Sequence, residues 1–413
     1  MVTQQGSVVI VGAGQAGGWV ALTVRDLQPE RPIILIGEED HPPYERPPLS
    51  KDVLAGKATP ESTYLKPLTH YADAGIDLRL GHRVTAISPQ AKTVTLSTGA
   101  TLAYDQLVLA TGMQPRPLSL PGADHSRVRT LRTMQDLAPI RQFLAPGHKV
   151  VCIGAGFIGL EIAAIASRSG CAVTVLEAGP VAMGRVVAPE VSASIVRRHE
   201  KQGVTFRFNV SIEAIEDRDG AALVRLAGGD GIPADLVLVG IGGLTNCQLA
   251  RDAGIACENG ISVDAEGRTS EPDIFAAGDV CHQYSVALGR TIRLESWQNA
   301  QNQAIAVGKL IAGAPEPYVD LPWFWTDQYE DNFQIVGAPE RWDRLIWRGS
   351  PDDDKFTAIY LLDGRVVAGN TLNNARDIRP LRQMILDRAE IDPALLKDTE
   401  TALIKIQKIQ AAQ

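Results

Sequence analysis

Paired cysteines and long apolar runs are both missing from this sequence of 413 residues. Its five cysteines are scattered, odd in number and without a C-x-x-C motif, a pattern that indicates a reduced, cytoplasmic protein. No apolar run approaches the ~18 residues that a membrane span needs. The first expected strand begins near Ser7, which leaves no room for a signal peptide. We therefore expect a protein that does not act in a membrane.

The usual marks of hydrolytic and metal chemistry are absent as well. The sequence has no G-x-S-x-G or H-E-x-x-H motif, and its seven histidines show no metal-ligand spacing, so we expect no metal. A formal net charge of −8 argues against a general nucleic-acid binder. The length predicts two or three domains, and 45% apolar with 21% charged residues is ordinary for a globular protein.

What the sequence does contain is a glycine motif present in two copies. VVIVGAGQAGG at 8–18 and VCIGAGFIGLE at 151–161 each follow a β-branched run and open into a helical pattern, the setting that dinucleotide binding requires. The first glycine of such a motif permits a tight turn, the second lets the backbone approach a pyrophosphate, and the third lets the helix pack on the strand. These glycines are Gly12, Gly14 and Gly17 in the first copy and Gly154, Gly156 and Gly159 in the second.

Each copy then continues to a second apolar strand that ends in an acid. Glu38 and Glu177 stand roughly 20 residues beyond their glycines, where a carboxylate can accept hydrogen bonds from a ribose. The chain is therefore predicted to bind two dinucleotides. No arginine is adjacent to Glu177, so the 2′-phosphate of NADPH would face a carboxylate, which favours NADH. A loop could still bring Arg185 to that phosphate.

The segments between the motifs predict further strands and one irregular loop. The prolines of HPPYERPPLSK, 41–51, predict a shaped loop without regular structure. A buried strand is expected at 107–110, directly before Thr111-Gly112, and another within 234–243. The second nucleotide unit is thus expected to begin near His148 and to end at that later strand.

The last third of the sequence changes character twice. EPDIFAAGDV, 271–280, predicts a strand leading into Gly278-Asp279 and indicates that the chain returns to its first domain, which would make the second nucleotide unit an insertion. Past Pro322 an aromatic-rich stretch is followed by an Asp363-Gly364 hairpin signal and a helical segment, 379–389. These features predict a separate small β-rich domain with helices.

Taken in order, the segments ERPPLSK, LVLATG, GAGFIGLE, FAAGDV, ESWQNAQNQA and FWTDQYE resemble the NADH-dependent ferredoxin reductases of bacterial Rieske oxygenase and cytochrome P450 systems. The resemblance covers nearly the whole chain. It implies an α/β protein of the glutathione-reductase-type flavoprotein fold, with two Rossmann-like dinucleotide-binding domains, for FAD and NAD, and a C-terminal α+β interface domain. The implied ranges are 1–113 and 246–323 for the FAD domain, 114–245 for the NAD domain and 324–413 for the interface domain.

The resemblance also implies roles for individual residues. The first glycine loop would hold the FAD pyrophosphate and Glu38 its ribose, and Lys51 would form an ion pair with Glu161 beside the isoalloxazine ring. The other residues implied at the FAD site are Arg46, Thr111, Gly112, Asp279 and Trp297. The second glycine loop, with Glu177 and Arg185, would hold NADH. Plainer interpretations stay open, since a surface arginine, a helix N-cap aspartate, a solvated glutamate or core tryptophans would fit the same positions.

The loop at 42–51 contains no cysteine that could take electrons from a flavin, unlike the corresponding loop of disulphide-reducing relatives. The chain also lacks a C-x₄-C-x₂-C ferredoxin pattern, so a separate [2Fe–2S] ferredoxin is the expected acceptor. We expect it to dock near Arg293 and Trp325. The other arginines expected to attract it are Arg290, Arg341, Arg344 and Arg348.

Two other functions fit the same fold. One is a reductase of a small organic acceptor such as monodehydroascorbate or a quinone. The other is a flavin-controlled interaction protein resembling apoptosis-inducing factor, although the long C-terminal insertions expected of it are missing. The sequence leaves the oligomeric state open.

Overall fold

The computed structural model describes residues 6–410, and side chains as far as 407. The chain divides into two compact units, each assembled from separate stretches of sequence. The first contains the described residues up to Pro47, Thr59–Gln114 and Gly243–Pro322. The second contains Pro48–Ala58, Pro115–Gly242 and the described residues from Trp323 onward. Each unit is described by itself.

A five-stranded parallel sheet, in the order β19-β7-β1-β2-β3, forms the centre of the first unit. Its strands are β1 (Val8–Val11), β2 (Ile33–Ile36), β3 (Ile76–Arg79), β7 (Gln106–Leu109) and β19 (Ile274–Ala276). Val8 pairs with Ile33 on one side and with Gln106 on the other. Because β1 is paired on both sides and covered on both faces, its sequence is a continuous apolar run rather than an alternating one.

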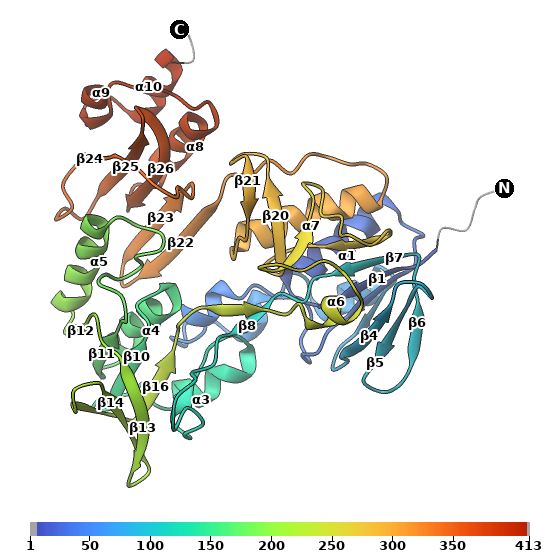
Figure 1. Cartoon of the computed structure of the whole chain (residues 1–413), viewed down its shortest axis with the longest axis horizontal. Helices are drawn as coiled ribbons and strands as arrows, with labels where there is room; N and C mark the ends of the chain where they lie inside the picture. Colours follow the sequence, from blue (N-terminus) through green and yellow to red (C-terminus); the bar gives the residue numbers. More distant parts are fainter. Residues whose placement is uncertain (1–5, 411–413) are drawn as a thin grey trace. The chain divides into compact units, whose positions relative to one another are not determined.

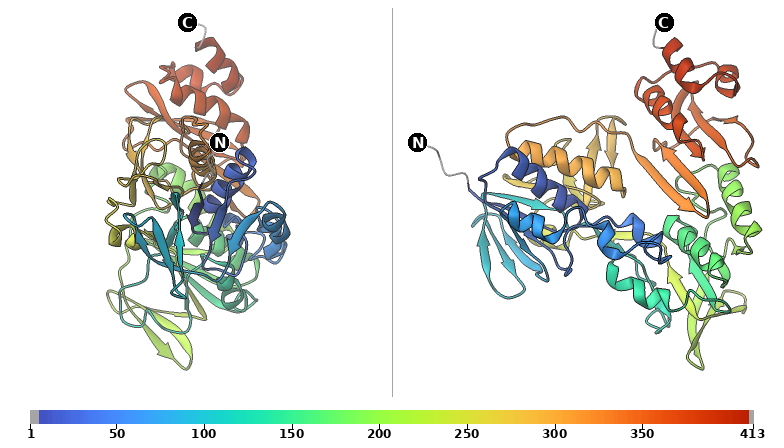
Figure 2. Two further views of the ribbon diagram at one scale, coloured as in Figure 1. Left: turned by 90° about the vertical axis from the view of Figure 1, so that its right-hand side faces the viewer. Right: turned by 180° about the vertical axis from the view of Figure 1, so that it is seen from behind.

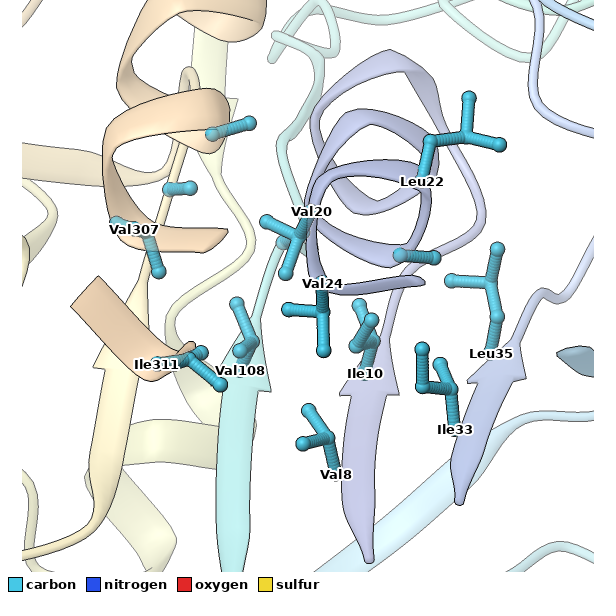
Figure 3. Close-up of a cluster of buried hydrophobic side chains, with 14 of the residues drawn as sticks. Val8, Ile10, Val20, Leu22, Val24, Ile33, Leu35, Val108, Val307 and Ile311 are labelled. Atoms are coloured by element: carbon cyan, nitrogen blue, oxygen red, sulfur yellow. The ribbon is translucent and has the colours of Figure 1, made fainter. Parts of the chain in front are cut away.

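Two helices lie side by side on one face of this sheet (Figures 1 and 2). They are α1 (Gln15–Leu27) and α7 (Trp297–Ile311). Figure 3 shows Val20 of α1 and Val307 of α7 directed at the valine and isoleucine side chains of the strands. Gly308 lets the helices approach closely, because a Cβ there would lie 2.8 Å from the Cβ of Thr23. The glycine in AIAVGKL is therefore a packing residue.

The opposite face of the sheet carries a three-stranded antiparallel sheet, β4-β5-β6. Val9 and Val11 of β1 share a buried cluster with Val94 and Leu96 on that side. The remaining elements of this unit are η2 (Pro60–Thr63), α2 (Leu68–Asp73), β4 (Val84–Ser88), β5 (Thr93–Leu96), β6 (Thr101–Ala103), β17 (Gly243–Thr245), α6 (Gln248–Asp252), β18 (Ile261–Val263), β20 (Cys281–Ser285) and β21 (Arg290–Ile292), together with β8 (Met113–Pro115) at its boundary.

The second unit repeats this architecture around its own glycine motif. Its parallel sheet has the order β12-β11-β10-β16-β9, and an antiparallel sheet, β13-β14-β15, packs on one face. The strands are β9 (Val128–Arg129), β10 (Lys149–Ile153), β11 (Ala172–Leu176), β12 (Thr205–Arg207), β13 (Ile212–Arg218), β14 (Ala221–Leu226), β15 (Gly231–Ala234) and β16 (Leu236–Val239). The helical elements are η1 (Pro47–Ser50), η3 (Met134–Asp136), α3 (Leu137–Arg141), α4 (Phe157–Arg168) and α5 (Pro189–Lys201).

The chain beyond Pro322 forms an antiparallel sheet in the order β22-β23-β26-β25-β24. Its elements are β22 (Trp323–Gln328), β23 (Asp331–Val336), β24 (Arg344–Arg348), β25 (Phe356–Leu362), β26 (Arg365–Leu372), η4 (Ala375–Asp377), α8 (Ile378–Leu386), α9 (Pro393–Lys397) and α10 (Leu403–Gln410). The predicted hairpin is confirmed: Asp363 and Gly364 join β25 to β26 with φ of 50° and 78°, as a tight primed turn requires. The helix predicted at 379–389 is α8, which begins one residue earlier and ends at Leu386.

The two predicted strand-turn-helix units are confirmed, as β1-α1 and β10-α4. The chain returns to the first sheet at β19, which pairs with β7. The proline-rich loop contains more regular structure than expected, because Pro47–Ser50 forms the 3₁₀ turn η1. Proline fits the first turn of a helix, where no intrahelical N–H bond is lost.

Candidate functional site

The first glycine loop connects β1 to α1 and leaves room for an anion. Gly12 has φ of +108°, and a Cβ there would lie 2.2 Å from the carbonyl oxygen of Ala110. A Cβ at Gly17 would lie 1.9 Å from the carbonyl oxygen of Gly12, whereas one at Gly14 would meet nothing within 4 Å. Gly14 is the N-cap of α1, and because it has no side chain it supplies no acceptor to the N–H groups of the first turn. A pyrophosphate fits this arrangement.

The second loop has the same geometry between β10 and α4. Gly154 has φ of +99° and lies against the carbonyl of Gly240, which a Cβ would approach to 2.5 Å. A Cβ at Gly159 would lie 2.1 Å from the carbonyl oxygen of Gly154, while the nearest atom to one at Gly156 is 3.8 Å away. Gly156 caps α4 without a side-chain bond. Both motifs thus carry the features that a dinucleotide site needs.

The two acids behind the glycine loops are held differently. Glu38, just beyond β2, is about two-thirds exposed and pairs with Arg83 at 3.2 Å. Glu177, just beyond β11, accepts hydrogen bonds from the backbone N–H groups of Ala155 and Gly179, both at 2.8 Å. Ala155 belongs to the second glycine loop. The Glu177 carboxylate is therefore tied to the loop that would bind the pyrophosphate.

Other predicted residues lie at the carboxyl edge of the first sheet. Thr111 follows β7, and Asp279 follows β19 after Gly278, so both stand at the edge where the glycine loop leaves β1. Asn246 ties down the Thr111-Gly112 turn: the Thr111 hydroxyl donates to its carbonyl at 2.9 Å, and its amide donates to the Thr111 carbonyl at 2.8 Å. Ligands bind at this edge in doubly wound proteins.

Arg46 belongs to a compact charged cluster in the same unit. Its guanidinium contacts Glu39 at 2.7 Å and the hydroxyl of Tyr44 at 2.8 Å, and the Tyr44 hydroxyl donates to Glu39 at 2.6 Å. Burial works to lower the pKa of Arg46, but Tyr44, Glu39 and Asp279 together raise it above its ordinary value. The influence of Asp279 indicates that Arg46 lies near the carboxyl edge of the sheet.

Trp297 is the first residue of α7 and is linked to the first glycine loop. Its backbone carbonyl accepts a hydrogen bond from the side-chain amide of Gln15 at 3.1 Å, and Gln15 is the first residue of α1. Ser296 caps α7 by accepting from the N–H of Asn299. Gln15 was missed by the sequence reasoning, although its place directly after Gly14 is the signal that could have identified it.

In the second unit, Lys51 and Glu161 form a buried ion pair. The Lys51 Nζ lies 2.7 Å from Glu161 Oε1, and the two side chains are only 15% and 4% exposed. The hydroxyl of Ser50 donates to Glu161 Oε2, and the hydroxyl of Thr326 donates to Oε1 at 2.7 Å. The structure therefore brings together the predicted pair and adds two donors that sequence reasoning missed. The plainer interpretation of Glu161 as a solvated helix carboxylate is wrong, because the residue is buried.

Trp325 lies next to this pair. Its indole stacks on Trp323, with ring centroids 5.0 Å apart, and the Lys51 ammonium lies 5.9 Å from its ring centroid. Its Nε1 donates to Asp327 at 3.2 Å. Trp325 is half-buried, so part of its ring is accessible.

The predicted arginines differ in their surroundings. Arg293 is mostly buried and pairs with Glu295, and Arg341 and Arg344 are exposed. Arg348 is 6% exposed, and its guanidinium donates to three backbone carbonyls at the end of α9 and in the segment that follows it. These carbonyls belong to Leu396, Asp398 and Thr401. The expectation that Arg348 attracts a partner is therefore corrected: it fastens the C-terminal helices to β24.

Arg185 occupies an exposed position near Gly242, where a Cβ added to the glycine would lie 3.6 Å from the Arg185 guanidinium. Gly242 follows β16, so Arg185 stands at the carboxyl edge of the second sheet.

Within residues 6–410, no helix is both long enough and apolar enough to cross a bilayer. The same residues contain no cluster of three or more histidine, cysteine or acidic side chains arranged to hold a metal ion.

Comparison with known proteins adds the family. Residues 6–304 match the pyridine nucleotide-disulphide oxidoreductase model, and residues 323–407 match the reductase C-terminal model. The chain belongs to the pyridine nucleotide-disulphide oxidoreductase family. It is 40% identical to putidaredoxin reductase CamA of Pseudomonas putida, over 97% of this chain and 96% of that one.

Two further similarities extend over nearly the full length. The ferredoxin–NAD(+) reductase component of the anthranilate 1,2-dioxygenase system of Burkholderia cepacia is 40% identical, over 96% of this chain and 98% of the other. The crystal structure of the covalent putidaredoxin reductase–putidaredoxin complex superimposes with a TM-score of 0.96 at 39% identity, covering 100% of both chains. The resemblance to ferredoxin reductases, the α/β fold and the cofactors FAD and NADH are thereby confirmed, and the chain is an oxidoreductase.

Proposed function

We propose that the protein is an NADH-dependent ferredoxin reductase, which passes electrons through FAD to a separate [2Fe–2S] ferredoxin that serves a cytochrome P450 or a Rieske oxygenase. The observation that carries this proposal is the full-length similarity to reductases that act in such systems. The similarity includes the C-terminal domain as well as the dinucleotide-binding region.

We assign the two glycine loops to the two cofactors. In the first unit the loop after β1 would hold the FAD pyrophosphate and Glu38 the adenosine ribose. The other residues assigned to FAD are Arg46, Thr111, Gly112, Asp279 and Trp297. In the second unit the loop after β10 would hold the NADH pyrophosphate and Glu177 the adenosine ribose. The matching open space at Gly14 and Gly156 supports this assignment.

Electrons would leave the protein without passing through a cysteine. The loop at 42–51 contains none, and all five cysteines of the chain are free thiols. Burial raises the pKa of Cys152 to about 12 and, as the main cause, that of Cys257 to about 11, so both thiols are unreactive near neutral pH. Free, unreactive thiols also support a cytoplasmic location.

The overall reaction balances with a one-electron acceptor. NADH gives up a hydride, which carries two electrons, two ferredoxins each accept one electron, and one proton is released. When bound, FAD supplies the group that takes up electrons in a pair and releases them singly. The protein's own residues have the task of holding both dinucleotides in place and excluding water from the transfer.

Lys51 is the residue that we assign to the flavin. Family resemblance implies that it stands beside the isoalloxazine ring, where an ammonium would favour the electron-rich reduced form. Its pairing with Glu161 and its position over Trp325 leave the ammonium little freedom. An ordered cation is more effective than a mobile one, because it needs no reorganisation at the moment of transfer.

We further propose that NADH is preferred over NADPH. Glu177 already accepts two backbone N–H bonds at the glycine loop, so its carboxylate cannot easily turn away from an incoming 2′-phosphate. Two like charges about 4 Å apart repel by roughly 4 kcal/mol at an effective dielectric of ~20. Arg185 lies near Gly242, which follows β16. In the sheet, β10 separates β16 from β11, the strand that ends directly before Glu177.

The direct test is reduction of cytochrome c by NADH, with and without a [2Fe–2S] ferredoxin. A ferredoxin reductase reduces cytochrome c slowly alone and much faster once catalytic ferredoxin is added. Ferricyanide, a small acceptor, serves as the control for an intact flavin site. Fast reduction of a quinone or of monodehydroascorbate, with no stimulation by ferredoxins, would contradict the proposal and identify a small-acceptor reductase instead.

A further inference from the structure

A row of polar side chains leads from Glu161 into the interior of the second unit. Thr326 lies on β22, and its hydroxyl is 2.7 Å from Glu161 Oε1. Gln328, two residues further along the strand, places its amide nitrogen 3.2 Å from that hydroxyl. The amide oxygen of Gln328 lies 2.8 Å from Nε2 of His199, on α5. All four side chains are buried, and Thr326 and His199 are fully inaccessible.

The charge on Glu161 fixes the direction of every hydrogen bond in this row. Because Glu161 is paired with Lys51, it is a carboxylate and can only accept, so the single hydroxyl proton of Thr326 points at it. Thr326 must then accept from Gln328, which turns the Gln328 oxygen toward His199. The imidazole must therefore carry its proton on Nε2.

On the other side of the ring, this tautomer leaves Nδ1 as an acceptor, and Nδ1 lies 3.1 Å from the hydroxyl of Tyr329, which can donate to it. Burial, the largest cause, lowers the pKa of His199 to about 4, although Gln328 and the nearby Asp331 act to raise it. Asp331 itself pairs with Arg198 at 3.2 Å. The imidazole is thus neutral near pH 7, with one donor and one acceptor.

We propose that Thr326, Gln328 and His199 form an oriented hydrogen-bond chain that positions the Glu161 carboxylate and, through it, the Lys51 ammonium at the flavin. Every N–H and O–H dipole of the chain points toward Glu161, so each bond polarises the next in the direction that stabilises the negative charge. The three residues act through Glu161, so they are positioning residues. The chain rests on the proposed role of Lys51 in the function above.

The test compares two identical substitutions at buried threonines. Thr326→Val removes the donor to Glu161 and the acceptor for Gln328 with little change in volume. Thr357→Val is the matched control: Thr357 is equally inaccessible, lies on β25, and donates to Asp377 rather than to Glu161. Thr326→Ser restores the hydroxyl. Each purified holoenzyme is mixed with saturating NADH in a stopped-flow instrument without ferredoxin, and flavin reduction is followed as a function of pH.

Thr326→Val should slow flavin reduction about tenfold, which corresponds to about 1.4 kcal/mol. The loss should be seen across the whole pH range measured, because the hydroxyl is absent at every pH. Thr326→Ser should recover most of the rate, and Thr357→Val should match the unaltered enzyme. A wild-type rate and profile in Thr326→Val, or equal slowing in Thr357→Val, would overturn the proposal.

A second measurement reports on His199 without any turnover. In holoenzyme labelled with ¹⁵N-histidine, one imidazole should be neutral, protonated on Nε2, and should not titrate between about pH 5.5 and 8; His199→Gln identifies its signals. In Thr326→Val, the preference of His199 for a proton on Nε2 should be weaker, because Glu161 no longer fixes the orientation of the Gln328 amide. Protonation on Nδ1 in the unaltered protein would refute the chain.

Failure of the chain and failure of the proposed function give different results. Flavin reduction by NADH and the state of His199 are measured in the absence of ferredoxin, so they test the chain alone. If Thr326→Val has the expected effects but ferredoxins do not stimulate the unaltered enzyme, the hydrogen-bond chain is supported and the proposed function is refuted.

Discussion

Removing the Lys51 ammonium should distinguish two contributions of this residue: its effect on the stability of the fold, through the buried ion pair, and its effect on flavin reduction. At 2.7 Å, the attraction between Lys51 and Glu161 is about 6 kcal/mol at an effective dielectric of ~20. Within residues 6–410, Lys51→Met would leave a carboxylate that is 4% exposed and accepts from the Ser50 and Thr326 hydroxyls. Breaking one side of a buried pair typically costs about 3–5 kcal/mol.

Protonation of the abandoned carboxylate sets an upper limit on this cost. Neutralising a glutamic acid whose ordinary pKa is about 4.3 requires roughly 3.7 kcal/mol at pH 7. Because the Glu161 carboxylate of the variant can take up a proton, the free energy of unfolding lost through the uncompensated charge should not exceed about 4 kcal/mol. The folded variant would then bind a proton more tightly than its unfolded chain does. Its stability should rise as the pH falls from 7 toward 5, and the penalty should shrink.

The assay combines unfolding with flavin reduction in three proteins: the unaltered enzyme, Lys51→Met, and the double variant Lys51→Met/Glu161→Gln. Lys51→Met should lower the unfolding temperature at pH 7 by roughly 6–12 °C, as expected for a loss of about 3 kcal/mol. The double variant should recover most of this loss because no buried charge remains. Flavin reduction by NADH should stay slow in both.

Equal stability of Lys51→Met and the double variant would show that Glu161 is not an uncompensated charge in the single variant, which would refute the electrostatic reasoning. Unchanged flavin reduction in Lys51→Met, with FAD still bound, would show instead that the lysine is only structural.

Three other substitutions test the remaining assignments. Gly17→Ala should abolish FAD binding, seen as loss of flavin absorbance, because its methyl group would lie 1.9 Å from the carbonyl oxygen of Gly12; normal FAD content would contradict the site. NADPH should give a kcat/KM more than tenfold below that of NADH, and Glu177→Gln should narrow the gap by removing the charge while keeping an acceptor for the loop; equal values in the unaltered enzyme would refute the preference. Arg293→Glu should raise the KM for ferredoxin and flatten its salt dependence, leaving ferricyanide reduction unchanged, whereas loss of both activities would place Arg293 in the flavin site.

The parts of the fold that could be predicted are those whose geometry is set by the backbone. VVIV and the run before Gly154 predict central strands because a strand buried on both faces has only apolar positions. The glycine spacing predicts the loops because Gly12 and Gly17 sit where a Cβ would collide with a carbonyl. Asp363-Gly364 predicts its hairpin for a similar reason, since both residues need positive φ.

The donors around Glu161 could not be predicted, because nothing local distinguishes them. Ser50 and Thr326 lie 111 and 165 residues from Glu161 in the sequence, and each is an ordinary hydroxyl in its own segment. His199 is similar: it continues the buried face of α5 formed by Val191 and Ile195, and its partner Gln328 is 129 residues away. Only the folded unit shows that these side chains form one network around a single charge.

Arg348 is a residue whose role the sequence pattern predicted wrongly. Its sequence neighbourhood, with Arg341 and Arg344, suggested a positive surface for an acidic partner. In the structure its side chain is buried at the end of β24, where its guanidinium donates to three backbone carbonyls and lies 3.9 Å from Asp377. Strands expose alternate residues, so Arg344 and Arg348, four positions apart, would be expected on the same face. Their different exposure reflects the cover that α9 and the segment after it provide at one end only. Positive charge counted along a strand therefore overstates what a partner can reach.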